Sequence, residues 1–280
     1  MRLTAVHDAC AAVKVQPGAR DEEAAPAQGA LMRLFMPFVG SLIVVGAVVA
    51  PLAASAAASR SQVFVVGALH ALHEREPDFS YEQLGRVIEA VKPDVLLLEV
   101  RPDELAEKKE TQGRPEYPQV VWPLLAARDY QALPLEPGDP LFSEMVSQAS
   151  GAAERFAKAK PDASARLDAY RKAQTAALLE LWRSPADVHG ELTANLTRAA
   201  QHVQHSLVGP EEEAVQTRWD GYMADRALEA VRANPGKRIL VLGSYRNRAV
   251  FVERLREAGD ADVVDMATWL RTNGFDGAPR

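Results

Sequence analysis

Two side chains that could activate water or bind a metal follow apolar runs of the sequence. His70 lies just beyond Gly67, where the run Val63-Phe64-Val65-Val66 stops. Glu99 directly follows the run Val95-Leu96-Leu97-Leu98. A neutral imidazole and a carboxylate form either two ligands of a divalent metal or an acid–base pair that acts on water. On this spacing alone, a hydrogen-bonded surface histidine is the alternative interpretation of His70.

Both apolar runs are typical of strands buried on both faces of a parallel sheet. The segment between them begins with the capping-box sequence Ser80-Tyr81-Glu82-Gln83 and ends at Lys92-Pro93. Its apolar residues repeat at helical spacing on one face: Leu84, Val87, Ile88 and Val91. Strand, helix and strand at this spacing predict a βαβ unit with parallel, adjacent strands. Because the ends of such strands share one edge, we expect His70 and Glu99 to lie close together.

Further strands are predicted later in the chain. Leu133-Pro134-Leu135-Glu136 contains a proline, so we expect it at the sheet edge with Glu136 at its end. Ile239-Leu240-Val241-Leu242 is a third buried run, which ends at Gly243 shortly before Arg246, and Val263-Val264 adds a short strand. The pattern predicts an α/β fold with a central, mostly parallel sheet flanked by helices, in which His70, Glu99 and Arg246 converge within roughly 10 Å.

The stretch from about residue 141 to residue 209 shows no strand pattern. Its apolar residues repeat at helical spacing in two stripes: Leu167, Tyr170, Leu178 and Leu181, then Leu192, Leu196, Ala199 and Val203. We therefore expect an all-helical insertion between the strand groups. Such an insertion could cover the carboxyl ends of the strands as a lid or serve only as a packing layer.

An uncharged segment near the N-terminus predicts export. Residues 34–53 lack charge, follow Arg33 and precede a run of small residues. Residues 32–59 are therefore expected to be a signal peptide cleaved at Ala54-Ser55-Ala56 or an uncleaved membrane anchor, rather than a buried helix of the folded protein. Residues 1–31 are a leader or a misassigned start, because Met32-Arg33-Leu34 repeats Met1-Arg2-Leu3. Residues 60–280 are then a single periplasmic or otherwise extracytoplasmic domain.

The composition excludes several classes of function. With 280 residues, 48 % of them apolar, the chain can bury a substantial core. Its formal net charge of −6 and its lack of a Lys/Arg-rich block argue against nucleic-acid binding. The single cysteine, Cys10, excludes a disulfide framework and a cysteine-based zinc knuckle within one chain. A bound metal would therefore need histidine and carboxylate ligands.

Four other residues have a spacing that resembles metal-ligand motifs. His73 and Glu74 follow His70, but the spacing of three differs from the helical motif of zinc proteases, so solvated side chains are expected. His202 and His205 lie one turn apart on a predicted helix, where a polar surface is the expected role.

Four segments together resemble the TraB/GumN/TIKI superfamily, which is related to erythromycin-esterase-like proteins and to haem-binding ChaN-like proteins. They are Gly67-x-x-His70, Pro93 to Glu99, Arg218-Trp219-Asp220-x-x-Met223-Ala224, and Lys237 to Gly243. The resemblance covers most of residues 62–257 except the helical insertion. It implies a divalent metal or an activated water at His70 and Glu99, with Arg218 and Asp220 as substrate-binding candidates. Glu136 is a further substrate-binding candidate because it ends a predicted strand near this edge. An ion pair on a solvated helix is the alternative for Arg218 and Asp220.

One departure from this family pattern concerns the second Gly-x-x-His motif, which here reads Gly243-Ser244-Tyr245-Arg246. Arginine stays cationic and offers no lone pair to a metal. The resemblance therefore loses one expected ligand, and Arg246 is expected to stabilise an anionic substrate group or an oxyanion beside His70 and Glu99.

Three functions are compatible with these features. The first is an exported hydrolase or peptidase that acts on a small molecule or peptide through His70, Glu99 and Arg246. The second is a binding protein that holds haem iron or another ligand through His70. The third is an interaction protein of the cell envelope in which the site is degenerate. A membrane is a partner only through an uncleaved N-terminal segment.

Overall fold

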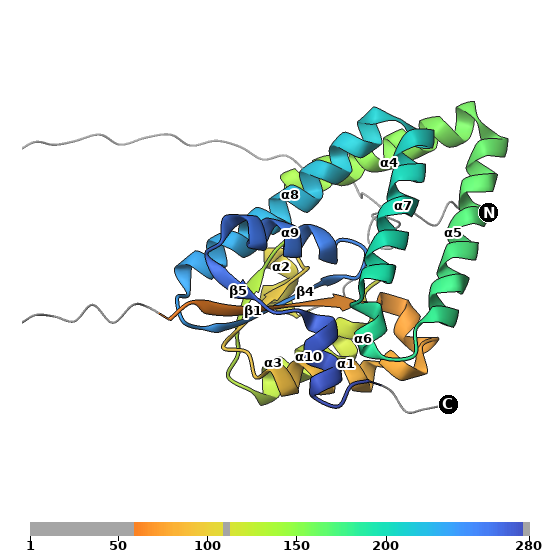
Figure 1. Ribbon diagram of the computed structural model, residues 1–280. Coiled ribbons are helices and arrows are strands. Elements are labelled where there is room, and N and C mark those ends of the chain that lie inside the picture. Colours follow the sequence, from red (N-terminus) through yellow and green to blue (C-terminus); the bar gives the residue numbers. More distant parts are fainter. Residues whose placement is uncertain (1–58, 109–112, 277–280) are drawn as a thin grey trace, which may run out of the picture. The chain divides into compact units, whose positions relative to one another are not determined.

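The computed structural model describes residues 59–108 and 113–276, so the predicted leader and signal or anchor segment lie outside the described residues. Five strands form one all-parallel sheet in the order β3-β2-β4-β1-β5 (Figure 1). The strands are β1 (Ser61–Ala68), β2 (Val95–Leu98), β3 (Gln131–Pro134), β4 (Arg238–Ser244) and β5 (Ala261–Val263). The predicted α/β class and parallel sheet are confirmed, and β3, which contains Pro134, lies at one edge.

The expectation that β1 and β2 are neighbours is wrong, because β4 lies between them. β4 pairs with β1 through Val63 and Ile239 and with β2 through Val95 and Ile239. Residues 239–244 of β4 are all buried, as expected for a strand with partners on both sides and layers on both faces. All three strands are parallel, so their carboxyl ends still share one edge of the sheet.

Helices cover both faces of the sheet, and alternate residues of each strand face opposite layers. On one face, Phe64, Leu96 and Leu240 pack with α1 (Tyr81–Val91), α3 (Trp122–Ala127), α6 (Pro185–Val188) and α10 (Met266–Thr272). On the other, Val65 and Val241 pack with α4 (Leu141–Ala159), α8 (Pro210–Ala233) and α9 (Arg248–Ala258). Figure 1 shows α9 above the sheet and α1 and α10 below it.

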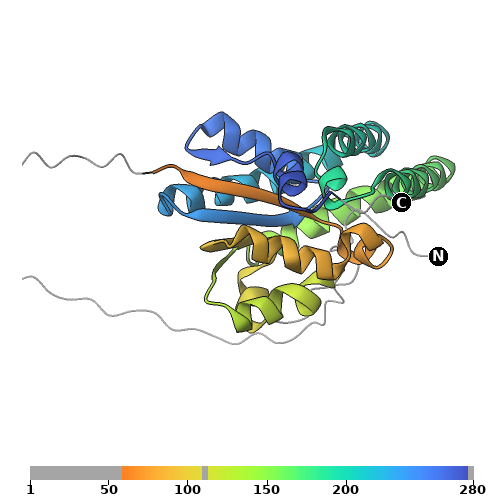
Figure 2. The same ribbon diagram turned by 60° about the horizontal axis from the view of Figure 1, so that its bottom comes forward.

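The helical character predicted for residues 141–209 is confirmed by α4, α5 (Pro161–Leu181), α6 and α7 (Glu191–Val208), and α8 continues this helical segment. In Figures 1 and 2 the green helices of this segment extend beyond the carboxyl ends of the strands. Met145 of α4 and Met223 of α8 are fully buried against the sheet. Part of the segment therefore packs against the sheet, and part of it extends past the sheet edge at which the candidate site lies.

The loops between these elements contain short helical turns that position the site. They are the 3₁₀ turns His70–Glu74 and Pro77–Phe79, the short helix α2 (Pro102–Glu107) and the π-helical turn Tyr117–Val121. Ser80 caps α1 by accepting a hydrogen bond from the backbone N–H of Gln83, as the capping-box sequence predicts.

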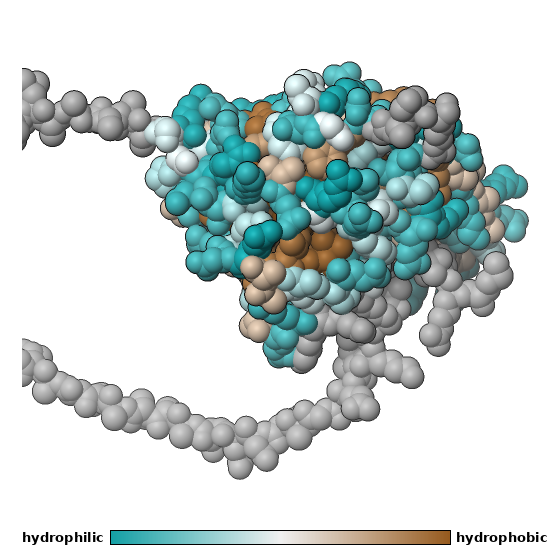
Figure 3. All heavy atoms as spheres, turned by 90° about the horizontal axis from the view of Figure 1, so that it is seen from below, coloured by the Kyte–Doolittle hydropathy of each residue, from teal (hydrophilic) through white to brown (hydrophobic). Residues whose placement is uncertain are grey.

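The surface seen from below is mostly hydrophilic, with a hydrophobic area near its centre and smaller hydrophobic areas elsewhere (Figure 3). The helices on this side thus turn polar faces outward, as expected for a layer between core and water. Within the described residues, no helix combines the length and the apolar character needed to cross a membrane.

Candidate functional site

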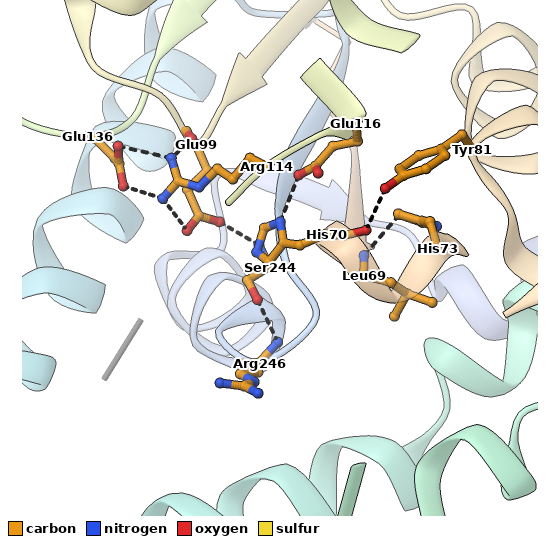
Figure 4. A network of polar contacts seen from close by, with 10 residues as sticks. All are labelled: Leu69, His70, His73, Tyr81, Glu99, Arg114, Glu116, Glu136, Ser244 and Arg246. Carbon is orange, nitrogen blue, oxygen red and sulfur yellow. Dashed lines mark hydrogen bonds and ion pairs between the residues drawn. The ribbon is translucent and has the colours of Figure 1, made fainter. Parts of the chain in front are cut away.

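The carboxyl ends of β1, β4 and β2 lie side by side, as predicted from their parallel direction. Gly67 is in register with Gly243, and Leu98 is in register with Leu242. The last residue of β4, Ser244, and the segments after β1 and β2, which contain His70 and Glu99, lie at one edge of the sheet (Figure 4). This edge is the place where open α/β sheets usually bind ligands.

His70 forms a close pair with Glu116, a residue that the sequence analysis did not single out. Nδ1 of His70 lies 2.7 Å from Oε1 of Glu116, whose side chain is buried, while the imidazole is 14 % exposed. Burial alone lowers the pKa of His70, but the charge and hydrogen bond of Glu116, helped by Glu99, outweigh it and raise that pKa. Burial also opposes ionisation of Glu116, but the nearby His70 lowers its pKa. The raised pKa of His70 and the lowered pKa of Glu116 both favour an ion pair in which the carboxylate orients the imidazole and stabilises its protonated form.

The other ring nitrogen of His70, Nε2, has no hydrogen-bond partner among the described residues. The backbone of His70 adopts a left-handed conformation with φ 53°, which a non-glycine residue rarely takes. Such conformations require support from the surrounding structure. Part of this support is a hydrogen bond that Tyr81 Oη donates to the carbonyl of His70 at 3.3 Å.

Two buried histidines hold the backbone that leads to His70. Nε2 of His73 accepts the N–H of Leu69 at 2.9 Å, and Nε2 of His189 accepts the N–H of Gly67 at 2.9 Å. Each then donates from Nδ1 to a backbone carbonyl, that of Phe79 for His73 and that of Pro185 for His189. Both rings are therefore neutral, with the proton on Nδ1.

Burial lowers the pKa of His73 to about 4 and that of His189 to about 3, with the Arg248 charge adding to the effect at His189. The expectation that His73 is solvated is wrong, because its ring fills the core beside Phe79; Glu74 is exposed. His189 carried no motif in the sequence and was missed. It connects the helical segment to β1.

Glu99 belongs to a buried triad with Arg114 and Glu136. Nη2 of Arg114 lies 3.2 Å from Oε1 of Glu99 and 2.6 Å from Oε1 of Glu136, and Nη1 lies 3.1 Å from Oε2 of Glu136. Nη1 also donates to the backbone carbonyl of Glu99. The other oxygen of Glu99, Oε2, accepts the backbone N–H of Ser244. The triad thereby joins the ends of β2, β3 and β4.

Charge effects in the triad follow from burial and from mutual contact. Burial opposes the charge of Arg114, but Glu136 and Glu99 raise its pKa well above the ordinary value. Burial raises the pKa of Glu136 against the lowering influence of Arg114. The sequence predicted Glu136 at a strand end near the site. In the structure Arg114 contacts both Glu136 and Glu99 and so links the two carboxylates. Arg114 carried no motif that would have identified it from the sequence.

Both glycines of the two strand ends are required by close packing. A Cβ atom on Gly67 would lie 2.8 Å from Cα of Tyr245, closer than such atoms approach. A Cβ atom on Gly243 would lie 3.0 Å from the Phe251 ring and 3.2 Å from Oε2 of Glu99. Glycine therefore allows the Glu99 carboxylate to lie against the backbone of β4.

Arg246 lies at the same edge but turns away from His70 and Glu99 (Figure 4). Its side chain is exposed, and Nε donates to Oη of Tyr245 at 3.3 Å, with the guanidinium 5.7 Å from the centre of the Tyr245 ring. In this conformation Arg246 does not stabilise charge beside His70, contrary to the expectation from the sequence.

The remaining candidates lie on the helical segment. Arg218 is exposed and forms an ion pair at 3.2 Å, as the alternative interpretation expects, but its partner is Glu144 and not Asp220. Asp220 is buried, accepts a hydrogen bond from Gln216 at 2.9 Å, and has its pKa raised to about 7 by burial, with a contribution from the Glu99 charge. His202 is exposed, and His205 lies 3.5 Å from the buried carboxylate of Glu212.

The donor atoms at the sheet edge do not fit a metal shared by His70 and Glu99. Both oxygens of Glu99 already contact Arg114 and Ser244, and a guanidinium beside the carboxylate repels a metal cation. Among residues 59–108 and 113–276, no three or more His, Cys, Asp or Glu side chains are grouped to hold a metal ion.

Comparisons with protein-family models, curated proteins and solved structures find no match to this chain.

Proposed function

We propose that the protein is a hydrolase in which His70, oriented by Glu116, activates a water molecule. The observation that carries this proposal is the 2.7 Å contact between Nδ1 of His70 and Oε1 of Glu116, which leaves Nε2 without a partner among the described residues. A carboxylate on one ring nitrogen fixes the tautomer and makes the opposite nitrogen a proton acceptor. The location at the carboxyl edge of a parallel sheet supports the same function.

In the proposed reaction, neutral His70 takes a proton from water at Nε2 while the water oxygen attacks the electrophilic carbon of an ester or amide. The imidazolium then returns this proton to the leaving group, and the bond between carbon and leaving group breaks. Glu116 accepts a hydrogen bond from Nδ1–H of His70 throughout and stabilises the transient positive charge of the imidazolium. Because base catalysis needs neutral imidazole, the rate should rise as the pH passes upward through the raised pKa of His70.

The triad of Glu99, Arg114 and Glu136 has a positioning role in this proposal. Arg114 is fixed to the ends of two strands by three carboxylate contacts, and Glu116 follows it by two residues in the chain. Anchoring Arg114 therefore anchors the segment that presents Glu116 to His70. No step of the proposed reaction uses a metal.

The resemblance to the TraB/GumN/TIKI superfamily supports the hydrolase class, and the uncharged segment of residues 34–53 supports export of the domain. Export itself is tested by expressing the full chain, separating cytoplasmic, periplasmic and membrane fractions, and sequencing the N-terminus of the product. A new N-terminus close to Ala56 supports cleavage, an intact membrane-bound chain supports an anchor, and an intact cytoplasmic chain contradicts export.

The hydrolase proposal is tested with a panel of p-nitrophenyl esters and p-nitroanilides. We expect His70→Asn to reduce kcat by roughly 10²- to 10⁴-fold, as the loss of a general base does. His202→Asn is the matched control, because that histidine is exposed on α7. Hydrolysis that is equal in wild type and His70→Asn, or absent throughout the panel, contradicts the proposal.

One observation favours a second function, the binding of haem iron by His70. Metal-ligating histidines typically contact a carboxylate through the ring nitrogen that does not bind the metal, as Nδ1 of His70 contacts Glu116. Titration with haem tests this function. A Soret shift that disappears in His70→Asn and persists in His202→Asn supports haem binding, whereas an unchanged spectrum contradicts it. If His70→Asn reduces neither hydrolysis nor haem binding, the result supports an interaction protein with a degenerate site instead.

A further inference from the structure

Three buried carboxylates contact two cations at the edge of the sheet, and a fourth, that of Asp220, interacts electrostatically with Glu99. Glu99, Glu116, Glu136 and Asp220 are each at most 8 % exposed. Among the residues that the structure describes, the cationic groups in contact with these carboxylates are the guanidinium of Arg114 and the imidazole of His70. Arg114 divides one positive charge between two carboxylates, and Asp220 accepts its hydrogen bond from a neutral amide. Negative charge at this edge is therefore in excess.

A second observation concerns Glu116 and is independent of this charge balance. Oε1 binds His70, but Oε2 is buried and has no hydrogen-bond partner among residues 59–108 and 113–276. An unpartnered buried carboxylate oxygen is unfavourable, because it has lost water without gaining a donor. The part of the chain that the structure describes thus leaves one strong acceptor beside the imidazole unsatisfied, and a donor that carries positive charge would satisfy it best.

The buried carboxylates act on their surroundings through a medium of low polarizability, where charge interactions are stronger than in water. The electrostatic field of these carboxylates reaches solvent at His70, because the His70 side chain is 14 % exposed, compared with 1 % for Glu116 and 7 % for Glu99. A substrate that reaches Nε2 of His70 therefore enters a negative potential.

From these contacts we infer that the His70 site selects substrates that carry a primary ammonium or guanidinium group. The inference rests on the proposed hydrolase function for its substrate, but its electrostatic part applies to any ligand of the site. It reverses the expectation of an anionic ligand, which depended on Arg246. That guanidinium contacts Tyr245 and points away from the carboxylates.

Binding of small probes tests the electrostatic part without any reaction. The probes are n-butylammonium, n-butanol and butyrate, which are similar in size and differ in charge. Binding is followed through the His70 imidazole resonances at about pH 8, where Asp220 is ionised. We expect n-butylammonium to bind roughly tenfold more tightly than n-butanol, and butyrate to bind most weakly. Equal binding of the three probes, or preference for butyrate, overturns the inference.

Two variants identify the source of the preference. Asp220→Asn removes one buried charge at nearly constant volume, so we expect the preference for n-butylammonium over n-butanol to fall severalfold. Glu253→Gln is the matched control, because it removes an exposed charge on α9 that pairs with Arg198. A preference that falls equally in both variants would show a general effect of net charge and overturn the assignment to this site.

Hydrolysis of a matched ester series separates the two proposals. The substrates are the p-nitrophenyl esters of 6-aminohexanoate, hexanoate and adipate, and we expect kcat/KM to decrease in that order, by roughly tenfold between the first two. If the cationic probe binds best but no ester is hydrolysed, the hydrolase proposal fails and the charge inference stands. If hexanoate or adipate is the better substrate, the charge inference fails and the hydrolase proposal stands.

Discussion

The carboxylate of Glu99 lies against the backbone of Gly243, where Oε2 would be 3.2 Å from a Cβ atom. The same oxygen accepts the N–H of Ser244, the next residue. A side chain at residue 243 would therefore disturb both the strand end and the carboxylate that binds Arg114.

Gly243→Ala should accordingly destabilise the protein by about 1 to 3 kcal/mol, because the Phe251 ring and Glu99 must both move to admit the methyl group. Urea unfolding measures this change in the free energy of unfolding. Gly221→Ala is the control, since α8 leaves open space at Gly221 and alanine favours the helix there. Equal stability of wild type and Gly243→Ala would show that the strand end adapts easily.

Arg114→Met should be more destabilising, by about 3 to 5 kcal/mol, because it leaves Glu99 and Glu136 buried beside each other without a counter-charge. Arg155→Met, at an exposed ion pair with Glu211, should change the free energy of unfolding by less than about 1 kcal/mol. Similar losses in the two variants would contradict a central role for the triad.

Glu116→Gln should lower the pKa of His70, because burial remains while the charge that opposes it is removed. The titration of the His70 resonances in NMR spectra measures this shift directly. An unchanged titration of His70 would contradict its pairing with Glu116 in solution.

His189 should make the fold sensitive to acid. Its pKa is about 3 in the folded chain, whereas an unfolded histidine titrates near about 6.5. The unfolded state therefore takes up a proton first as the pH falls below about 6.5, and wild type should lose up to about 1.4 kcal/mol per pH unit relative to His189→Gln between about pH 6 and 4. Unfolding curves at several pH values measure this difference, and parallel pH dependences would contradict it.

Asp220 should have the opposite effect on stability. Its folded pKa of about 7 exceeds the value near 4 of an unfolded aspartate, so the folded state binds the proton first. Wild type should therefore gain stability relative to Asp220→Asn as the pH falls from about 7 toward about 4. The same unfolding series tests this expectation, and a loss of stability over that range would show that Asp220 is held ionised.

Local patterns were sufficient to predict the elements that carry the site. Continuous apolar runs identify β1, β2 and β4, because strands buried on both faces have no polar face to interrupt the run. The capping box and the apolar stripe that follows it identify α1, since both depend on residues within one or two helical turns. The positions of Gly67 and Gly243 near the strand ends, and of His70 and Glu99 just beyond β1 and β2, follow from the same patterns, as does the helical segment between the strand groups.

What the sequence by itself determined is thus which segments form strands and helices and that their parallel ends share one edge. Only the tertiary structure decided that β4 separates β1 from β2, that Arg246 turns away, and that Glu116 meets His70. Strand order and side-chain pairs depend on contacts between residues that are far apart in the chain, which leave no periodic signal in it. His189 shows this most clearly, because it meets Gly67 across 122 residues and is positioned by the packing of α6 against the core.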